Sequence, residues 1–179
     1  MSAIIFQEAR VEDALAIAAL HALSWQQNYQ GVFSSDYLHS KVLEERKQVW
    51  LQRLQHPKPN QYILLAKKDD ELYGFACSFF NDDEQYGTLL DNLHIRDIAK
   101  GTGIGRMLMA KTAEKVVSQK AENKGMYLWV VQGNDKAFQF YTHLGAQTAE
   151  TLMANDIGDK DFYKTRMVWF SSHLLLQTK

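Results

Sequence analysis

The sequence contains little cysteine and no excess of charge of either sign, and each shortage excludes a class of protein. The single cysteine, Cys77, cannot close an intrachain disulfide, which is typical of a chain kept in a reducing compartment. Twenty lysines and arginines stand against 21 aspartates and glutamates, for a net charge of -1. Because phosphate binding needs at least a local basic excess, this balance predicts no nucleic-acid partner.

Long apolar runs and flexible linkers are also missing. The run Ile4-Ile5-Phe6 follows no basic residue and is too short for a secretion signal, and no stretch approaches the roughly 20 apolar residues that cross a bilayer. The chain has 179 residues, of which 46% are hydrophobic, as in one ordinary globular domain. We therefore expect a single domain over residues 1–179, in the cytoplasm and without a membrane partner.

The spacing of apolar residues predicts an α/β domain with a mixed sheet and helices on both of its faces. Two helices are predicted first, with apolar stripes at Val11, Leu15, Ala18, Ala22 and Trp25 over residues 12–29, and at Leu43, Trp50 and Leu54 over residues 43–54. In the second helix we expect charged residues on the opposite face. The predicted strands are 3–7, 61–67, 72–80, 86–95, 126–131, 147–153 and 162–170, and the later helices are 103–121 and 134–144.

Three alternating glycines follow the strand predicted over 86–95, in the segment Lys100-Gly101-Thr102-Gly103-Ile104-Gly105-Arg106. Glycine lets a ligand approach the backbone, and amides at a helix N-terminus attract anions, so the segment favours a phosphate or pyrophosphate site. It lacks both the nucleoside-triphosphate loop pattern and the spacing of the dinucleotide fingerprint. A glycine-rich connection without a ligand is the structural alternative.

The same segment resembles the coenzyme A motif of the GCN5-related N-acetyltransferase (GNAT) family, Arg/Gln-x-x-Gly-x-Gly/Ala, with Lys100 at the first position. Three further segments resemble the family in the same order: residues 9–14 with 24–31, residues 90–95, and the set Asn134, Ala137, Phe140, Tyr141 and Gly145. The resemblance covers nearly the whole chain. It implies a mixed, mostly antiparallel sheet of about seven strands flanked by helices on both faces. It also implies an N-acetyltransferase that uses acetyl-CoA as co-substrate.

The resemblance further implies where the cofactor binds. The pantetheine arm would lie between two splayed strands against the backbone of the Leu93-His94-Ile95 segment, as an added strand does. The Lys100–Arg106 loop would hold the pyrophosphate, and Asn134 would reach the pantetheine. Asn134 is also well placed as an ordinary helix N-cap, and the two roles are compatible.

Acetyl transfer to an amine needs an acid for the departing thiolate and a base for the amine. Tyr141 matches the acid of the family, although it could also be a core aromatic beside Phe140. Asp91 and His94 are the candidate bases, because both lie on the strand predicted to carry the acetyl site and His94 titrates near neutral pH. Each could instead have a structural hydrogen bond.

The remaining expectations concern the acceptor and alternative functions. By resemblance, Trp25 and Tyr29 face the pocket of a small-molecule or peptide amine, although Trp25 could equally complete the helix stripe. Cys77 is expected to be a core thiol, and the histidines lack metal-ligand spacing, so no metal is predicted. The final strand and the tail 173–176 offer a surface for a homodimer. A non-catalytic acyl-CoA sensing domain is the main alternative, and a nucleotide-binding module is a more distant one.

Overall fold

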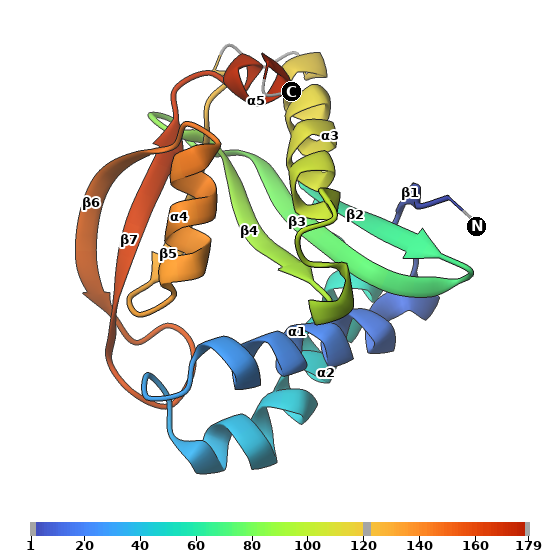
Figure 1. Cartoon of the computed structure of the whole chain (residues 1–179), viewed down its shortest axis with the longest axis vertical. Helices are drawn as coiled ribbons and strands as arrows, with labels where there is room; N and C mark the ends of the chain where they lie inside the picture. The colour runs from blue at the N-terminus through green and yellow to red at the C-terminus, as the bar shows by residue number, and fades with distance from the viewer. Residues whose placement is uncertain (1–2, 120–122, 178–179) are drawn as a thin grey trace.

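Seven strands form one sheet in the order β1-β2-β3-β4-β5-β7-β6, as the computed structural model of residues 3–119 and 123–177 shows (Figure 1). The strands are β1 (Ile5–Glu8), β2 (Gln61–Lys68), β3 (Glu71–Asp83), β4 (Gly87–Ile95), β5 (Met126–Val131), β6 (Gln147–Ala154) and β7 (Phe162–Trp169). Neighbouring strands are antiparallel except β4 and β5, which are parallel. The predicted mostly antiparallel sheet of seven strands is confirmed.

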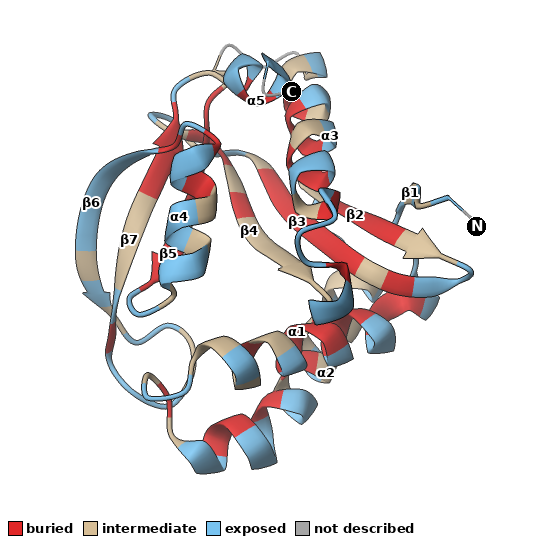
Figure 2. Ribbon diagram, in the orientation of Figure 1, coloured by how far each residue is buried: buried red, intermediate tan, exposed pale blue. Residues whose placement is uncertain are grey.

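Helices cover both faces of the sheet, as predicted, because strands and helices bury their apolar sides against each other. The helices are α1 (Ala14–Asn28), α2 (Val42–Gln55), α3 (Ile104–Ser118), α4 (Asp135–His143) and α5 (His173–Gln177). One core lies between α1, α2 and the sheet, where buried residues gather (Figure 2). Trp50 and Phe75 in this core are fully buried. None of the described helices is both long and apolar enough to span a membrane.

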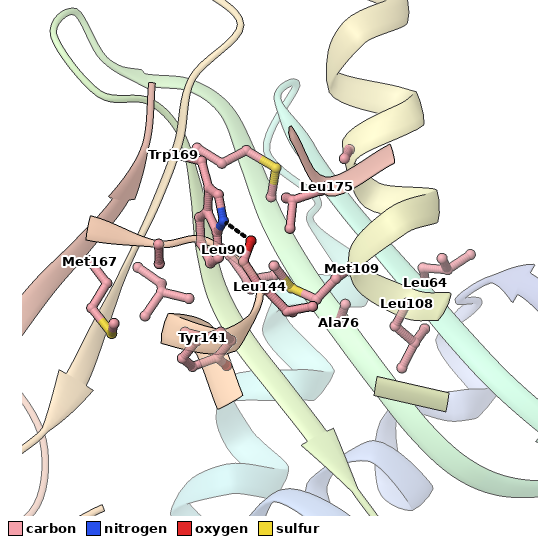
Figure 3. Close-up of a cluster of buried hydrophobic side chains, with 14 of the residues drawn as sticks. Leu64, Ala76, Leu90, Leu108, Met109, Tyr141, Leu144, Met167, Trp169 and Leu175 are labelled. Carbon is pink, nitrogen blue, oxygen red and sulfur yellow. Dashed lines mark hydrogen bonds between the residues drawn. The ribbon is translucent and has the colours of Figure 1, made fainter. Parts of the chain in front are cut away.

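The second core lies on the opposite face, under α3, α4 and α5. Leu108 of α3, Tyr141 of α4 and Leu175 of α5 meet the side chains of the central strands there (Figure 3). The indole Nε1 of Trp169 donates to the carbonyl oxygen of Leu144 at 2.8 Å, which fixes the end of α4 on β7. This contact matters for the site, because α4 carries Tyr141.

The predicted faces of the first two helices need correction. Val11 and Leu15 are 44% and 57% exposed, and the chain forms a 3₁₀ turn over Val11–Asp13 before α1 begins. The buried side of α1 instead carries Ala14, Ile17, Ala18, His21, Ala22 and Trp25. Alanine and histidine are only weakly hydrophobic, so the apolar pattern did not distinguish this side of the helix from the neighbouring one. The small alanine side chains allow the helix to approach the sheet closely.

In α2 the predicted division into an apolar and a charged face is wrong at two positions, Leu43 and Arg46. Leu43 is 42% exposed, whereas Arg46 is 8% exposed and lies on the buried side with Val42 and Trp50. A π-helical turn over Tyr37–Lys41 precedes α2 and sets the rotation at which the helix begins. The predicted helix 103–121 ends at Ser118, and its last two residues lie outside the described part of the chain.

Strands β4 and β5 diverge soon after they meet. Only two residue pairs join them, Thr88 with Met126 and Leu89 with Tyr127, and the rest of β4 runs away from β5 (Figure 1). An opening between two strands exposes backbone amides and carbonyls that would otherwise pair within the sheet.

A β-bulge in β4 decides which backbone groups face that opening. The pairing of β3 with β4 shifts between Cys77 and Ser78, which leaves Asp91 as the additional residue on β4. The Thr88 amide points to β5, where it donates to Gly125, but the Arg96 amide points to β3, where it donates to Tyr73. In a strand without a bulge these two amides would point the same way. The bulge therefore turns the backbone of residues 93 and 95 toward the opening.

Candidate active site

A cleft of about 800 Å³ lies where β4 and β5 diverge. It extends from the loop before α3, past α4, to the C-terminal part of α1 and to Arg46 and Arg53 of α2. Of the residues predicted from the sequence, those that line it are Trp25, Tyr29, Asp91, Leu93, His94, Ile95, Lys100, Gly101, Gly103, Ile104, Gly105, Arg106, Asn134 and Tyr141. Thr102 does not line it, and its hydroxyl donates to the carbonyl of Ala99 at 2.6 Å.

The glycine loop presents open backbone at one end of the cleft. Gly101 and Gly103 have φ of 78° and 87°, a conformation that favours glycine, and Gly103 directly precedes α3. A Cβ at either position would meet no described protein atom within 4 Å. The first amides of α3 have no partner within the helix and lie at its positive end, so they suit an anion.

Side chains at this loop tie it to α1. Lys100 forms an ion pair with Asp97 at 2.5 Å, and Gln27 of α1 donates to Asp97 at 2.6 Å. The hydrogen bond from Lys100 is the largest cause that lowers the pKa of Asp97. Lys100 is therefore held beside the loop by a partner that the sequence pattern did not reveal.

Tyr141 lies in the wall of the cleft and in the core at once. It is 8% exposed, and its ring packs edge-on against Phe140 and Trp169, with centroid distances of 5.2 and 6.0 Å. Burial raises the pKa of its phenol, and nearby Tyr29 adds to that shift. The phenol therefore keeps its proton at neutral pH, as an acid must.

Tyr29 and Asn134 meet across the same part of the cleft. Burial raises the pKa of Tyr29 to about 12, although a hydrogen bond with the Asn134 side chain acts in the opposite direction. Asn134 also accepts from the Ala137 amide at 3.3 Å, so its predicted N-cap role on α4 is confirmed. The phenols of Tyr29 and Tyr141 and the side-chain amide of Asn134 thus line the part of the cleft between α1 and α4.

Asp91 is held by an arginine that the sequence did not single out. The bulge brings Asp91 and Asn92 onto the same side of β4, where Nη1 of Arg53 donates to both, at 2.7 and 3.1 Å. One carboxylate oxygen is thereby committed to a cation of α2. Asp91 lines the cleft as predicted, and its role as general base stays a prediction.

His94 has a hydrogen bond of its own and little basicity. Its Nδ1 lies 2.8 Å from the Ser24 hydroxyl, and its ring centroid lies 4.4 Å from that of His21. Burial lowers the pKa of His94 to about 3, with the charges of Arg46 and Lys100 acting in the same direction. A neutral imidazole with this pKa accepts a proton poorly, which argues against His94 as the base.

His21, which is buried, and His94, which lines the cleft, make stability depend on pH. The pKa of His94 is about 3 and that of His21, which accepts a hydrogen bond from Trp50 at 3.0 Å, also lies well below its usual value. Unfolded imidazoles have a pKa of about 6.5, so below that pH the unfolded state binds more protons. The free energy of unfolding should therefore fall from pH 6.5 toward 3, by at most about 1.4 kcal/mol per pH unit and histidine.

Urea unfolding at several pH values measures this effect. The variant His94→Gln removes one of the two protonation sites, so its stability should depend less steeply on pH than that of the wild type. Equal slopes for the two proteins between pH 6 and 4 would contradict the assignment.

Cys77 is a core residue, as predicted. It is fully buried on β3, and burial raises the pKa of its thiol to about 12. Thiol-specific reagents at neutral pH should therefore modify it only when the chain unfolds. Rapid labelling in the native state would show that β3 opens locally. Among the described residues, no three His, Cys, Asp or Glu side chains gather as a metal site would require.

Comparison with known proteins agrees with this architecture. Residues 17–146 match the sequence model of the Acetyltransferase (GNAT) family, and the chain belongs to that family. A protein described as the uncharacterized N-acetyltransferase YuaI of Bacillus subtilis strain 168 is 25% identical over 146 residues, which cover 80% of this chain and 81% of YuaI.

Solved structures share the fold. The PaiA N-acetyltransferase from Thermoplasma acidophilum, in complex with coenzyme A, has a TM-score of 0.69 and 23% identity, with 91% of this chain and 98% of that chain covered. Apo-form YjaB from Escherichia coli has a TM-score of 0.66 and 19% identity, over 94% and 99% of the two chains. The arrangement of strands and helices around the cleft is thus that of N-acetyltransferases.

Proposed function

We propose that this chain transfers an acetyl group from acetyl-CoA to a primary amine, directly and within a ternary complex. The observation that carries the proposal is the opening between β4 and β5, which joins an anion-suited loop at one end to Tyr141 at its side. The coenzyme A bound to the PaiA relative supports the same ligand. Family membership supports the reaction class.

The residues present fit acetyl-CoA. The glycine loop leaves room above Gly101 and Gly103 that a Cβ would fill, and its amides would hold the pyrophosphate. The outward-facing backbone of residues 93 and 95 would pair with the pantetheine amides, as an edge strand pairs with an added one. When bound, the cofactor supplies the activated acetyl group and a thiolate leaving group.

The side chains of the site would handle the protons. The backbone amides that face the opening would donate to the acetyl oxygen, on which negative charge would develop. Tyr141 would give its phenolic proton to the sulfur of the cofactor as the bond between that sulfur and the acetyl carbon breaks. Asp91, or a water molecule that it orients, takes the proton of the amine, and the Arg53 ion pair fixes the direction of its carboxylate. His94 stays neutral and donates or accepts hydrogen bonds only.

Two measurements test the proposal in order. Isothermal titration should detect acetyl-CoA binding, and no heat at millimolar cofactor would contradict it. Release of free thiol should then accelerate when primary amines are added. Tight binding without turnover on any amine would instead identify a non-catalytic acyl-CoA sensing domain, for which a buried acid such as Tyr141 has no use.

A further inference from the structure

Arg46 is a buried cation at the α1–α2 end of the cleft, defined here by Ser24, Trp25, Asn28, Tyr29, Arg46 and Arg53. The residue is 8% exposed, yet it lines the cleft. Its guanidinium lies over the Trp25 ring, 4.6 Å from the centroid. Its charge also reaches the neighbouring wall, since it helps to lower the pKa of His94.

The hydrogen-bonding capacity of Arg46 is only partly used. Within the described residues, Nη2 contacts the carboxylate of Glu45, whereas Nε is buried without a hydrogen-bond partner. Glu45 is itself shared, because the Tyr37 hydroxyl donates to both of its oxygens at 2.9 Å. A guanidinium has five donors, and a buried charge is costly unless it is paired and hydrogen-bonded. An anionic group that enters the cleft would complete its pairing.

The surroundings favour an anion with a single charge. Glu45 contacts Arg46 and Asp91 lines the same cleft, and each of these carboxylates is already held by an arginine of α2. A phosphate dianion would bring two further negative charges beside them, whereas a carboxylate brings one. The planar guanidinium also matches the two oxygens of a carboxylate.

We propose that Arg46 receives a carboxylate of the acceptor, and that the acceptors of this enzyme are therefore amines that carry a carboxylate, such as amino acids. The inference rests on the acetyltransferase function proposed above and specifies its substrate class. In this proposal Arg46 determines the specificity for the acceptor, and the Trp25 ring packs against the guanidinium.

Matched acceptor pairs test the inference. Amino acids with small, aromatic and basic side chains are compared with their carboxamides, which keep the amine and lose the negative charge. Thiol release at saturating acetyl-CoA gives kcat/KM for each. The wild type should prefer the acids by about 10- to 100-fold, the range of a charged hydrogen bond.

The variant Arg46→Met should lose this preference, with kcat/KM falling for the acids and changing little for the amides. For each protein, kcat/KM for the acid is divided by kcat/KM for the amide. Comparing this ratio between variant and wild type cancels the difference in amine basicity between acid and amide. Arg46→Lys keeps the charge without the planar fork and should retain part of the preference. A wild type that shows no preference, or a ratio unchanged in Arg46→Met, overturns the inference while the acetyltransferase function stands.

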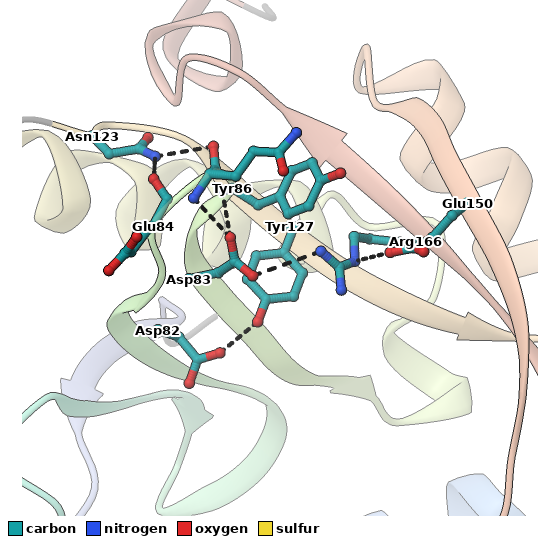
Figure 4. A network of polar contacts seen from close by, with 9 residues as sticks. Asp82, Asp83, Glu84, Tyr86, Asn123, Tyr127, Glu150 and Arg166 are labelled. Atoms are coloured by element: carbon teal, nitrogen blue, oxygen red, sulfur yellow. Dashed lines mark hydrogen bonds and ion pairs between the residues drawn. The ribbon is translucent and has the colours of Figure 1, made fainter.

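Arg166→Met is the matched control. Arg166 also lies over an aromatic ring, 4.5 Å from the centroid of Trp129, but its ion pairs with Asp83 and Glu150 lie outside the cleft lining (Figure 4). Its replacement should leave the acid-to-amide ratio unchanged. A fall in that ratio equal to the one in Arg46→Met would show a general effect on folding and overturn the inference.

Binding decides the matter independently of turnover. In the presence of coenzyme A, titration should show that N-acetyl amino acids bind the wild type more tightly than N-acetyl amino-acid amides do, and that Arg46→Lys reduces the difference. Equal affinities overturn the inference even if Arg46→Met does not fold. If acetyl-CoA binds but no amine is acetylated, the proposed function fails, and the binding comparison still tests the carboxylate site.

Discussion

Replacing Tyr141 by phenylalanine is expected to lower kcat and kcat/KM together by about 10²–10⁴-fold, the range for a positioned acid. The exchange removes only a hydroxyl, so the edge-on contacts of the ring with Phe140 and Trp169 should survive. Affinity for acetyl-CoA should change little, because the proton is needed only in the transition state. Steady-state kinetics and isothermal titration measure the two quantities.

The raised pKa of Tyr141 is compatible with this role. A phenol above its ordinary pKa is fully protonated at neutral pH, although it is a weaker acid than a free one. A thiolate released into the same buried site becomes more basic for the same reason, as burial of the Cys77 thiol on β3 illustrates. An acyl donor with a more acidic thiol needs less help, so the loss in Tyr141→Phe should shrink with such a donor.

Tyr127→Phe provides a matched control. Tyr127 is also buried with a raised pKa, but its hydroxyl donates to Asp82 and does not line the cleft. Its loss should leave kcat unchanged. If kcat is unchanged in Tyr141→Phe as well, Tyr141 is a core aromatic without a catalytic role, and the non-catalytic sensing domain is favoured. A selective rise in KM for acetyl-CoA would instead identify Tyr141 as a cofactor-binding residue.

Replacing Gly103 by alanine is expected to weaken acetyl-CoA binding by about 10- to 100-fold, the range for losing a hydrogen bond to a charged group. The new Cβ would stand in the open space above the loop amides, where the proposed pyrophosphate lies. The positive φ of Gly103 adds a stability cost of about 1–2 kcal/mol for any residue with a Cβ. Titration calorimetry and urea unfolding separate the two effects.

Gly145→Ala separates strain from the loss of binding. Gly145 has φ of 86°, nearly that of Gly103, and a Cβ there would also meet no described atom within 4 Å. It lies after α4 and does not line the cleft. Both variants should lose similar stability, but only Gly103→Ala should lose affinity for the cofactor. If the two variants bound acetyl-CoA with equal affinity, the assignment of the glycine loop as the pyrophosphate site would be contradicted. Gly158 is unsuitable as a control, because its Cβ would lie 2.3 Å from the Phe33 ring.

The sequence is most informative where a backbone conformation demands a residue type. Gly101 and Gly103 were predicted as an open turn before a helix, and both have the positive φ that explains glycine there. The strand predicted over 126–131 coincides with β5. Its continuous apolar run is the pattern expected of a strand that is buried on both faces of the sheet, as β5 is. The helices and strands and the glycine loop could thus be predicted from local pattern, whereas the mostly antiparallel sheet of seven strands was implied by the family resemblance.

Other parts of the site depend on contacts between distant segments, which local pattern does not contain. Arg46 and Arg53 resemble the charges of any amphipathic helix, and only the folded structure shows that both line the cleft. The low pKa of His94 arises from burial and from charges on α2 and the loop. The bulge at Asp91 is set by pairing with β3. In the sequence, Asp91 only interrupts the apolar alternation of Leu89, Leu93 and Ile95, and that interruption does not distinguish a bulge from a catalytic carboxylate.

The bulge at Asp91 separates two properties of β4, the direction of its backbone groups and the acidic side chain that the additional residue carries. Apolar substitutions at positions 93 and 95 keep the same backbone groups turned to the opening, so this strand can diverge in sequence without losing the proposed pantetheine contacts. Deleting the additional residue, Asp91, would leave Leu93 and Ile95 paired with Ala76 and Gly74 as before, so the same backbone groups would still face the opening. A gene copy with this single in-frame deletion could therefore keep the proposed pantetheine contacts while it loses the carboxylate proposed to take the proton of the amine.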